Sequence, residues 1–210
     1  DYHKNYNNYF NSKLILFKKL LKKKGLIIYD NDIKESKIIK SIIKKNNYKY
    51  LSIGKQGSLQ IIEHKFVKEK QVVKFKFKNK IYKFKTSLIG KVQIKNLLMA
   101  LLAATKVVSI RNIVRILSDI KPLQGRFEKI GNINNCAKVF LDYAHTPDAL
   151  KSCINSLKLQ FKMSPTSIVF GCGGDRDKPK RALMGKIASD LCDKVYLTDD
   201  NPRNENPKKI

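Results

Sequence analysis

The sequence contains no tryptophan, only three histidines and only four cysteines among its 210 residues. The cysteines lie far apart without a CxxC pair, and the histidines are not spaced with them as zinc ligands would be. We therefore expect reduced thiols in or beside apolar stretches, as in a cytosolic protein, and no zinc site. The cysteines are Cys136, Cys153, Cys172 and Cys192.

Acidic residues are also few. The chain has 17 Asp and Glu against 44 Lys and Arg, which gives a formal charge of +27. Such a charge is compatible with a basic nucleic-acid-binding module, which we keep as an alternative. The basic residues are nevertheless mostly lysines dispersed among Ile and Asn, whereas a nucleic-acid site would concentrate Arg and aromatic residues on one element. We therefore expect no nucleic-acid partner.

Several sequence signals are missing as well. The chain has no signal peptide and no apolar run long enough to span a bilayer, which predicts a cytoplasmic protein without a membrane partner. It has no Walker phosphate loop, because none of its Gly-Lys pairs is followed by Ser or Thr. It starts without a methionine, and we expect both of its ends to be cuts through a larger protein.

The first part of the chain combines two hydrophobic periods. Apolar residues at helical spacing predict helices over residues 7–25, 33–46, 92–108 and 111–120. The run LIIYD, residues 26–30, is typical of a short buried strand. Between residues 51 and 85 the period changes to two. Apolar residues there alternate with lysines around Asn79, which indicates a hairpin with one solvated face.

Strands and helices alternate strictly after the stretch PLQGRFE at residues 122–128, where we place a domain boundary. The predicted domains are residues 1–121 and residues 122–210. In the second, strands at 138–142, 167–171 and 194–198 alternate with helices at 147–160 and 181–192. Such alternation implies parallel strands, beyond whose carboxyl ends ligands bind. Polar motifs beginning at Asp142, Gly171 and Asp199 follow these strands, so we expect an active site on an α/β fold.

The motif LTDDNPR combines carboxylate, amide and guanidinium groups. Arg203 offers a planar fork of donors to an anion, whereas Asp200 and the carbonyl of Asn201 are acceptors suited to an ammonium. Together they suit a zwitterion such as an amino-acid head group. The alternative is an Asx-turn stiffened by Pro202. These residues alone leave both interpretations open.

The two preceding motifs also allow a functional and a structural interpretation. The loop GCGGDRDKPKR offers basic groups, among them Arg176 and Arg181, to an anion, or it is a solvated charged turn. In DYAHTPDAL, Thr146 is expected to cap the next helix. Asp142, at the strand end, can accept a hydrogen bond from a ribose hydroxyl. His145 is either a proton carrier or a hydrogen-bonding spacer.

Six stretches together carry a family likeness: DYHKNYNNYFNSKLILF, SLIGKVQIKNLLMALLAA, LQGRFEKI, VFLDYAHTPDAL, VFGCGGDRDKPKRALMGKIA and TDDNPR. In this order they resemble the Mur ligase family, and in particular its diaminopimelate-adding branch. The last three stretches are the most specific, and the likeness is weakest from Lys34 to Lys85. The resemblance implies an interior piece of a three-domain enzyme. Residues 1–121 would form the second half of the central ATP-binding domain, and residues 122–210 the first half of a Rossmann-like, amino-acid-binding C-terminal domain.

The resemblance implies an ATP-dependent amide-bond ligase of peptidoglycan precursor synthesis. The family activates the terminal carboxylate of UDP-N-acetylmuramoyl-L-alanyl-D-glutamate as an acyl phosphate, which the amine of meso-diaminopimelate then attacks. The implied cofactors are ATP and Mg²⁺, the partners are these two substrates, and the enzyme would be a monomer. Because the ATP phosphate loop would lie outside this chain, we expect residues 1–210 alone to be inactive.

The resemblance also assigns roles to individual residues. Lys13 falls where the family carries a carbamylated lysine that supports Mg²⁺, although composition alone makes it an ordinary surface lysine. The implied ATP contacts are Asn96, Arg126 and Asp142. The implied diaminopimelate contacts are Arg176, Asp200, Asn201, Pro202 and Arg203.

Two departures from the family pattern concern the adenine contacts: Val92-Gln93 before the helix of Asn96, and YDND at residues 29–32. A folylpolyglutamate synthetase-like ligase, a relative with the same architecture, is a further alternative. It should lack the DNPR sequence, so this motif argues against it.

Overall fold

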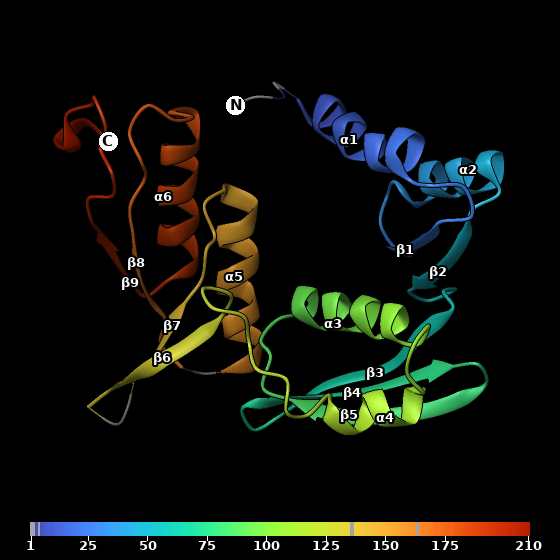
Figure 1. Ribbon diagram of the computed structural model, residues 1–210. Coiled ribbons are helices and arrows are strands. Elements are labelled where there is room, and N and C mark those ends of the chain that lie inside the picture. Colours follow the sequence, from blue (N-terminus) through green and yellow to red (C-terminus); the bar gives the residue numbers. More distant parts are fainter. Residues whose placement is uncertain (1–2, 4, 135–136, 163) are drawn as a thin grey trace. The chain divides into compact units, whose positions relative to one another are not determined.

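The chain folds into two compact units, one comprising the described residues up to Ile120 and the other running from Lys121 to Ile210. The computed structural model describes residues 3, 5–134, 137–162 and 164–210 (Figure 1). Cys136, for which the sequence predicts a reduced thiol, lies outside these residues.

A mixed five-stranded sheet, in the order β1-β2-β3-β4-β5, forms the centre of the first unit. Its strands are β1 (Leu26–Asp30), β2 (Lys49–Ile53), β3 (Leu59–Val67), β4 (Lys70–Phe77) and β5 (Lys80–Thr86). The first three strands pair in parallel, and β3, β4 and β5 follow one another antiparallel. Lys78 and Asn79 connect β4 to β5 with φ angles of 47° and 60°, as a two-residue hairpin turn requires. The predicted hairpin around Asn79 is therefore confirmed.

Four helices belong to this unit in the described part of the chain: α1 (Tyr6–Ile15), α2 (Ser36–Asn46), α3 (Lys91–Ala104) and α4 (Ile110–Ile116). Each was predicted, but three of the predicted ends are wrong. The first helix continues from α1 only through a π-helical segment, Leu16–Leu20. The third ends at Ala104, and Ser109 then caps the next helix, its hydroxyl accepting the N–H of Asn112. The fourth ends at Ile116.

The core of the first unit lies between the sheet and α3, which packs on β1 and β2. Val73, Phe75 and Phe77 of β4 are buried, whereas the intervening Lys74 and Lys76 are not. This alternation gives the sheet one apolar and one solvated face, as the sequence predicts. On the helix, Leu98 and Leu102 are fully buried against the apolar face. Burial of each such side chain contributes about 1.5–3 kcal/mol to folding.

In its described residues the second unit has two strand pairs, two α-helices and a short 3-10 helix. These are β6 (Glu128–Ile133) with β7 (Ala137–Leu141), β8 (Ser167–Phe170) with β9 (Lys194–Leu197), α5 (Pro147–Gln160), α6 (Pro179–Leu191) and the 3-10 helix Pro207–Lys209. The prediction of three mutually parallel strands is only partly right. In the described residues β8 and β9 are parallel, but β7 pairs antiparallel with β6. The sequence analysis missed β6 because most of its side chains are exposed and therefore leave no hydrophobic pattern.

The helices of the second unit pack on each other through Leu150 and Ile154 of α5 and Met184 of α6. The predicted cap is confirmed: the hydroxyl of Thr146 accepts the N–H of Ala149 at 3.3 Å, and α5 begins with proline. The remaining three cysteines are free thiols. In the part of the chain that the structure describes, no helix is long and apolar enough to cross a membrane.

Candidate functional site

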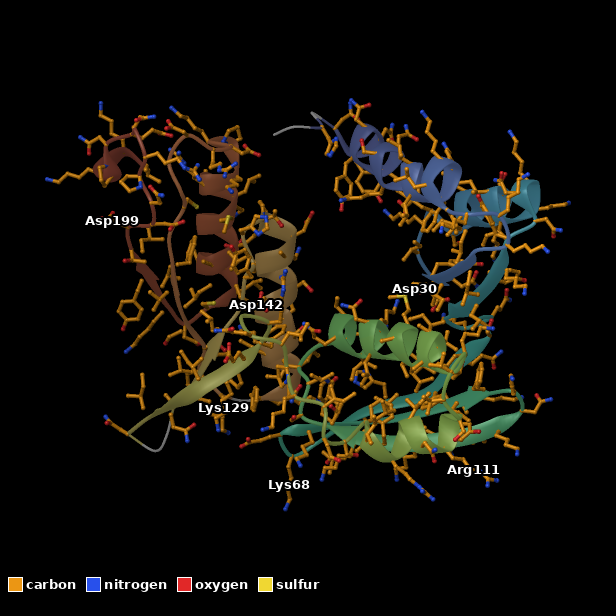
Figure 2. The ribbon with its side chains drawn as sticks, in the orientation of Figure 1. Asp30, Lys68, Arg111, Lys129, Asp142 and Asp199 are labelled. Carbon is orange, nitrogen blue, oxygen red and sulfur yellow. The ribbon has the colours of Figure 1, made fainter. Side chains whose placement is uncertain are left out.

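Two loops meet where the parallel strands β8 and β9 end. Because Phe170 pairs with Leu197, the segments after both strands leave the sheet at the same edge. We call residues 171–178 the glycine loop and residues 198–206 the DNPR loop. The N–H of Thr198 donates to the carbonyl of Phe170 at 3.1 Å, which continues the strand pairing into the loops. Figure 2 labels Asp199, at the start of the acidic run that follows β9.

The two loops touch backbone to backbone, which explains the need for glycine. A Cβ atom on Gly174 would lie 1.8 Å from the carbonyl oxygen of Pro202, and one on Gly171 would lie 2.3 Å from that of Thr198. Real Cβ contacts do not reach such distances, so no larger residue fits without a backbone shift. The N–H of Gly174 also donates to the main-chain oxygen of Asn201 at 2.8 Å. The glycine loop therefore fixes the backbone of the DNPR loop.

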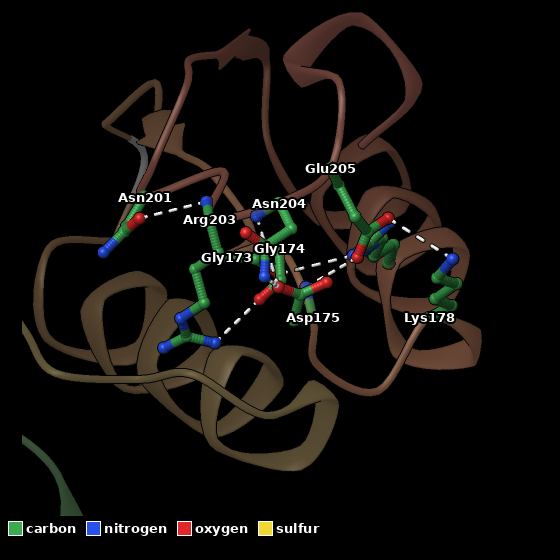
Figure 3. Close-up of polar contacts among 9 residues, drawn as sticks. Gly173, Gly174, Asp175, Lys178, Asn201, Arg203, Asn204 and Glu205 are labelled. Carbon is green, nitrogen blue, oxygen red and sulfur yellow. Dashed lines mark hydrogen bonds and ion pairs between the residues drawn. The ribbon is translucent and has the colours of Figure 1, made fainter.

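Asn201 and Arg203 form the predicted turn. The side-chain Oδ1 of Asn201 accepts the backbone N–H of Arg203 at 3.1 Å, and Arg203 has a left-handed φ of 49°. The Asx-turn interpretation is thus confirmed as geometry. It does not compete with a binding role, because Nη1 of Arg203 donates to the carbonyl of Gly174 at 2.7 Å and a guanidinium carries five N–H donors (Figure 3). One edge of the fork is anchored to the glycine loop.

Two other residues predicted to contact the ligand, Asp200 and Arg176, lie close to Gly173. The ideal Cβ position of Gly173 lies 3.6 Å from Oδ2 of Asp200 and 4.0 Å from Cγ of Arg176. Both side chains are exposed. A carboxylate and a guanidinium stem thus approach the same small residue, so the structure brings the sequence-predicted residues of both loops together.

A carboxylate of the DNPR loop that the sequence analysis did not select, Glu205, joins this loop to the glycine loop and to α6. Its oxygens accept Nη1 and Nη2 of Arg181 at 3.0 and 2.7 Å, and its Oε1 also accepts the N–H of Asp175 at 2.6 Å (Figure 3). Lys178 adds an ion pair at 3.4 Å. The Arg181 guanidinium, followed by the Asp175 N–H, lowers the pKa of Glu205 to about 2. No sequence motif signals this role, since Glu205 is one polar residue among several.

The side chain of Asp175 adds a further link between the two loops. Its Oδ2 accepts both the backbone N–H and the side-chain Nδ2 of Asn204, at 3.2 and 2.9 Å. Asp175 itself has a left-handed φ of 51°. Asp175 of the glycine loop therefore binds the DNPR loop, which leaves the exposed Arg176 of the same loop to a ligand.

The predicted nucleotide contacts of the second unit, Arg126 and Asp142, also lie together. Asp142 accepts the N–H of Phe127 at Oδ2 and that of Ala144 at Oδ1, each at 3.0 Å. Arg126 places its guanidinium 5.6 Å from the ring centroid of Tyr143. Asp142 thus fixes the segment that carries Arg126, and any bond to a ribose hydroxyl would use the remaining lone pairs of its carboxylate.

The contacts of His145 do not identify it as a proton carrier. Its Nδ1 lies 3.1 Å from the carbonyl of Tyr143, and its own carbonyl accepts Nζ of Lys180 at 3.2 Å. Its contacts are those of the spacer interpretation.

The first unit carries Lys13 and Asn96, both exposed, on α1 and α3 respectively. Nζ of Lys13 lies 5.2 Å from the ring centroid of Tyr9. Next to Asn96, Lys95 forms an ion pair with the buried Asp30 at the end of β1, which Figure 2 labels.

Residues for a metal ion are sparse. Within the described ranges, no three His, Cys, Asp or Glu side chains group as metal ligands. Mg²⁺ commonly takes only one or two protein ligands and completes its shell with phosphate and water oxygens. A single carbamate on Lys13 is compatible with that pattern.

Comparison with known proteins matches both parts of the chain to one family. Residues 1–104 match the family described as Mur ligase middle domain, and residues 125–210 match Mur ligase, glutamate ligase domain. The chain is 43% identical over 212 residues to UDP-N-acetylmuramoyl-L-alanyl-D-glutamate--2,6-diaminopimelate ligase of Rickettsia prowazekii (strain Madrid E). That match covers 100% of this chain and 43% of the relative, so the chain spans less than half of the relative's length.

Solved structures agree with this assignment. The structure of a UDP-N-acetylmuramoyl-L-alanyl-D-glutamate--2,6-diaminopimelate ligase superposes with a TM-score of 0.64 at 28% identity, covering 97% of this chain and 42% of that one. Folylpolyglutamate synthetase from Lactobacillus casei gives a TM-score of 0.70 at 18% identity, covering 93% of this chain and 49% of that one. At that identity the second likeness shows a shared fold only.

Proposed function

Because the chain belongs to the Mur ligase family, we propose that it forms part of an ATP-dependent ligase that adds meso-diaminopimelate to UDP-N-acetylmuramoyl-L-alanyl-D-glutamate. The observation that supports this amino-acid specificity is the contact between the two loops. Arg203 is anchored on Gly174, while Asp200 and Arg176 both approach Gly173. The name of the Rickettsia relative supports the same substrate.

The loops offer complementary groups to the distal end of diaminopimelate, which carries both an ammonium and a carboxylate. The guanidinium of Arg203 would bind the carboxylate through charge-assisted hydrogen bonds, with Arg176 as a second cation. The carboxylate of Asp200 would accept from the ammonium. Asn201 contributes chiefly through the turn, since its side-chain oxygen already accepts the Arg203 N–H and its main-chain oxygen the Gly174 N–H. Pro202 stiffens the same turn.

The reaction couples two transfers. The γ-phosphoryl group of ATP passes to the terminal carboxylate of the dipeptide substrate, which gives an acyl phosphate and ADP. The free amine of diaminopimelate then attacks the acyl carbon, loses a proton, and expels phosphate as the amide forms. Binding at the distal end holds this amine in place, and such positioning is a main source of rate enhancement.

The other residues of the proposal bind the nucleotide. Arg126, Asp142 and Asn96 would contact ATP. Mg²⁺, when bound, would neutralise phosphate charge, and Lys13 would hold it through a carbamate. Carbamylation requires the neutral amine, which reacts with carbon dioxide to give an anionic oxygen ligand.

The test uses a ligase that contains this chain. We expect release of ADP and phosphate to require both the UDP-linked dipeptide and meso-diaminopimelate. Equal turnover with glutamate in place of diaminopimelate would favour a folylpolyglutamate synthetase-like ligase instead. Tight, steeply salt-dependent retention of DNA in a filter-binding assay, without ligase turnover, would favour the nucleic-acid-binding alternative.

A further inference from the structure

Arg181 and Glu205 form a doubly hydrogen-bonded ion pair that joins the first turn of α6 to the end of the DNPR loop. We propose that this pair is a positioning device for the diaminopimelate site: it holds the DNPR loop in the one backbone conformation that aims Arg203 at the substrate carboxylate. The inference rests on the proposed function, because it assigns a role within the same site.

The pair is well shielded from solvent. The side chains of Arg181 and Glu205 are 11% and 15% exposed. Arg181 uses both terminal nitrogens on Glu205, and its Nη2 also lies 3.4 Å from the carbonyl of Gly173. Its Nε is buried without a partner in the described part of the structure. A guanidinium in this situation depends on its carboxylate, because removing Glu205 would leave a desolvated charge uncompensated.

Arg181 is therefore unsuited to bind a ligand directly. Arg176 and Arg203 are exposed, whereas the terminal nitrogens of Arg181 donate to Glu205 and the backbone and its Nε is buried. The sequence-based interpretation of Arg181 as a free cation for an anion is thus wrong in this structure. Its partner is supplied by the chain itself.

Glu205 connects the pair to both loops at once. Its Oε1 accepts the N–H of Asp175 at 2.6 Å, and Asp175 in turn binds Asn204 through two hydrogen bonds. Arg203 lies two residues before Glu205, in a left-handed conformation at φ 49°. A bulky residue in that conformation needs its surroundings to hold it. Without the ion pair, the loop loses its attachment to α6 immediately after the residue that grips the substrate.

The experiment compares Glu205→Gln with Asp190→Asn in a ligase that contains this chain. The control removes the same charge from an exposed i,i+4 ion pair of α6, Lys186–Asp190. In that pair Nζ of Lys186 lies 3.4 Å from Oδ2 of Asp190. For Glu205→Gln we expect the KM for meso-diaminopimelate to rise about tenfold to a hundredfold. The kcat at saturating diaminopimelate, and the KM for the UDP-linked dipeptide, should stay close to wild type.

Rescue separates positioning from general damage. Arg181→Lys keeps the charge but loses the double hydrogen bond, so it should raise the same KM less than Arg181→Met does. The double variant Arg181→Glu with Glu205→Arg should recover part of the loss. If the KM values of Glu205→Gln and Asp190→Asn both equal wild type, the positioning role is wrong. It is also wrong if Arg181→Lys and Arg181→Met lower kcat and raise every KM alike.

Failure of the proposed function gives a different result. In that case the wild-type ligase would show no diaminopimelate-dependent release of phosphate. Diaminopimelate-dependent wild-type turnover combined with an unaltered Glu205→Gln enzyme would contradict only the positioning role.

Discussion

The main-chain oxygen of Gly174 accepts a hydrogen bond from Nη1 of Arg203 at 2.7 Å, so the residue proposed to grip the substrate is itself held by the neighbouring loop. The same glycine donates its N–H to the main-chain oxygen of Asn201. Gly174 therefore contacts both the backbone of the DNPR loop and the guanidinium of Arg203.

Gly174→Ala should destabilise the second unit. The new methyl group would lie 1.8 Å from the carbonyl oxygen of Pro202, and backbone cannot yield as a flexible side chain can. We expect a loss of at least about 1–3 kcal/mol in the free energy of unfolding, measured by denaturant titration of the chain. Gly185→Ala in α6 is the matched control, because its Cβ position meets no atom within 4 Å apart from its chain neighbours and the adjoining backbone of its own helix. That variant should be neutral or slightly stabilising. Equal stability of both variants would contradict the close approach of the loops.

Arg203→Ala should remove the discrimination between diaminopimelate and lysine in a ligase that contains this chain. The two amino acids differ by the distal carboxylate, and a site built for a polar group rejects the analogue lacking it by about four orders of magnitude or more. We expect a large loss of kcat/KM for diaminopimelate and little change for lysine. Equal losses for both substrates would mean that Arg203 only supports the turn.

The stability contributed by Glu205 should depend on pH. Its pKa is lowered from 4.5 to about 2 by Arg181, so the folded state binds the proton less readily than the unfolded state. This contribution is fully present above the unfolded pKa and is lost as the pH falls through the folded pKa. The Tm difference between wild type and Glu205→Gln should therefore be constant from pH 6 to about pH 5 and shrink towards pH 2. A difference that grows on acidification would show that the ion pair does not stabilise the fold.

Lys13→Ala should abolish turnover in a ligase that contains this chain, because the proposed carbamate could no longer form. Short-chain carboxylates should restore part of the activity by supplying the missing oxygen ligand. Lys18→Ala, an exposed lysine of the adjoining π-helical segment, is the control and should leave activity unchanged. Near-normal turnover of Lys13→Ala would return this residue to the status of an ordinary surface lysine.

Elements with a local signal are those that the sequence predicts well. Asn79 marks the hairpin because a two-residue turn needs left-handed residues, and Thr146 marks the start of α5 because a hydroxyl followed by proline is a strong cap. β6 is missed because its pairing with β7 depends on hydrogen bonds between two segments and hardly on burial. Buried and exposed side chains therefore do not alternate along β6, and the strand has no hydrophobic pattern in the sequence.

The candidate site shows the same division. DNPR is recognisable because several uncommon groups are adjacent in the sequence, whereas the Arg181–Glu205 pair joins residues 24 positions apart. The parallel pairing of β8 and β9 places the two loops at the same edge of the sheet, and hydrogen bonds between residues far apart in the sequence then join them. Sequence analysis thus identifies the proposed ligand contacts but not the residues that hold them.

The lysines of the edge strand β5 affect how readily copies of the chain associate with one another. A sheet edge presents unpaired backbone groups on which another chain can add a strand, and lysines on such an edge oppose that addition. Lys80, Lys83 and Lys85 are exposed along β5, which is the last strand in the sheet order. Replacing them with Thr would keep the propensity for strand but remove the repulsion between copies. The lysine-rich composition thus helps a five-stranded mixed sheet with an antiparallel edge remain dispersed at high concentration.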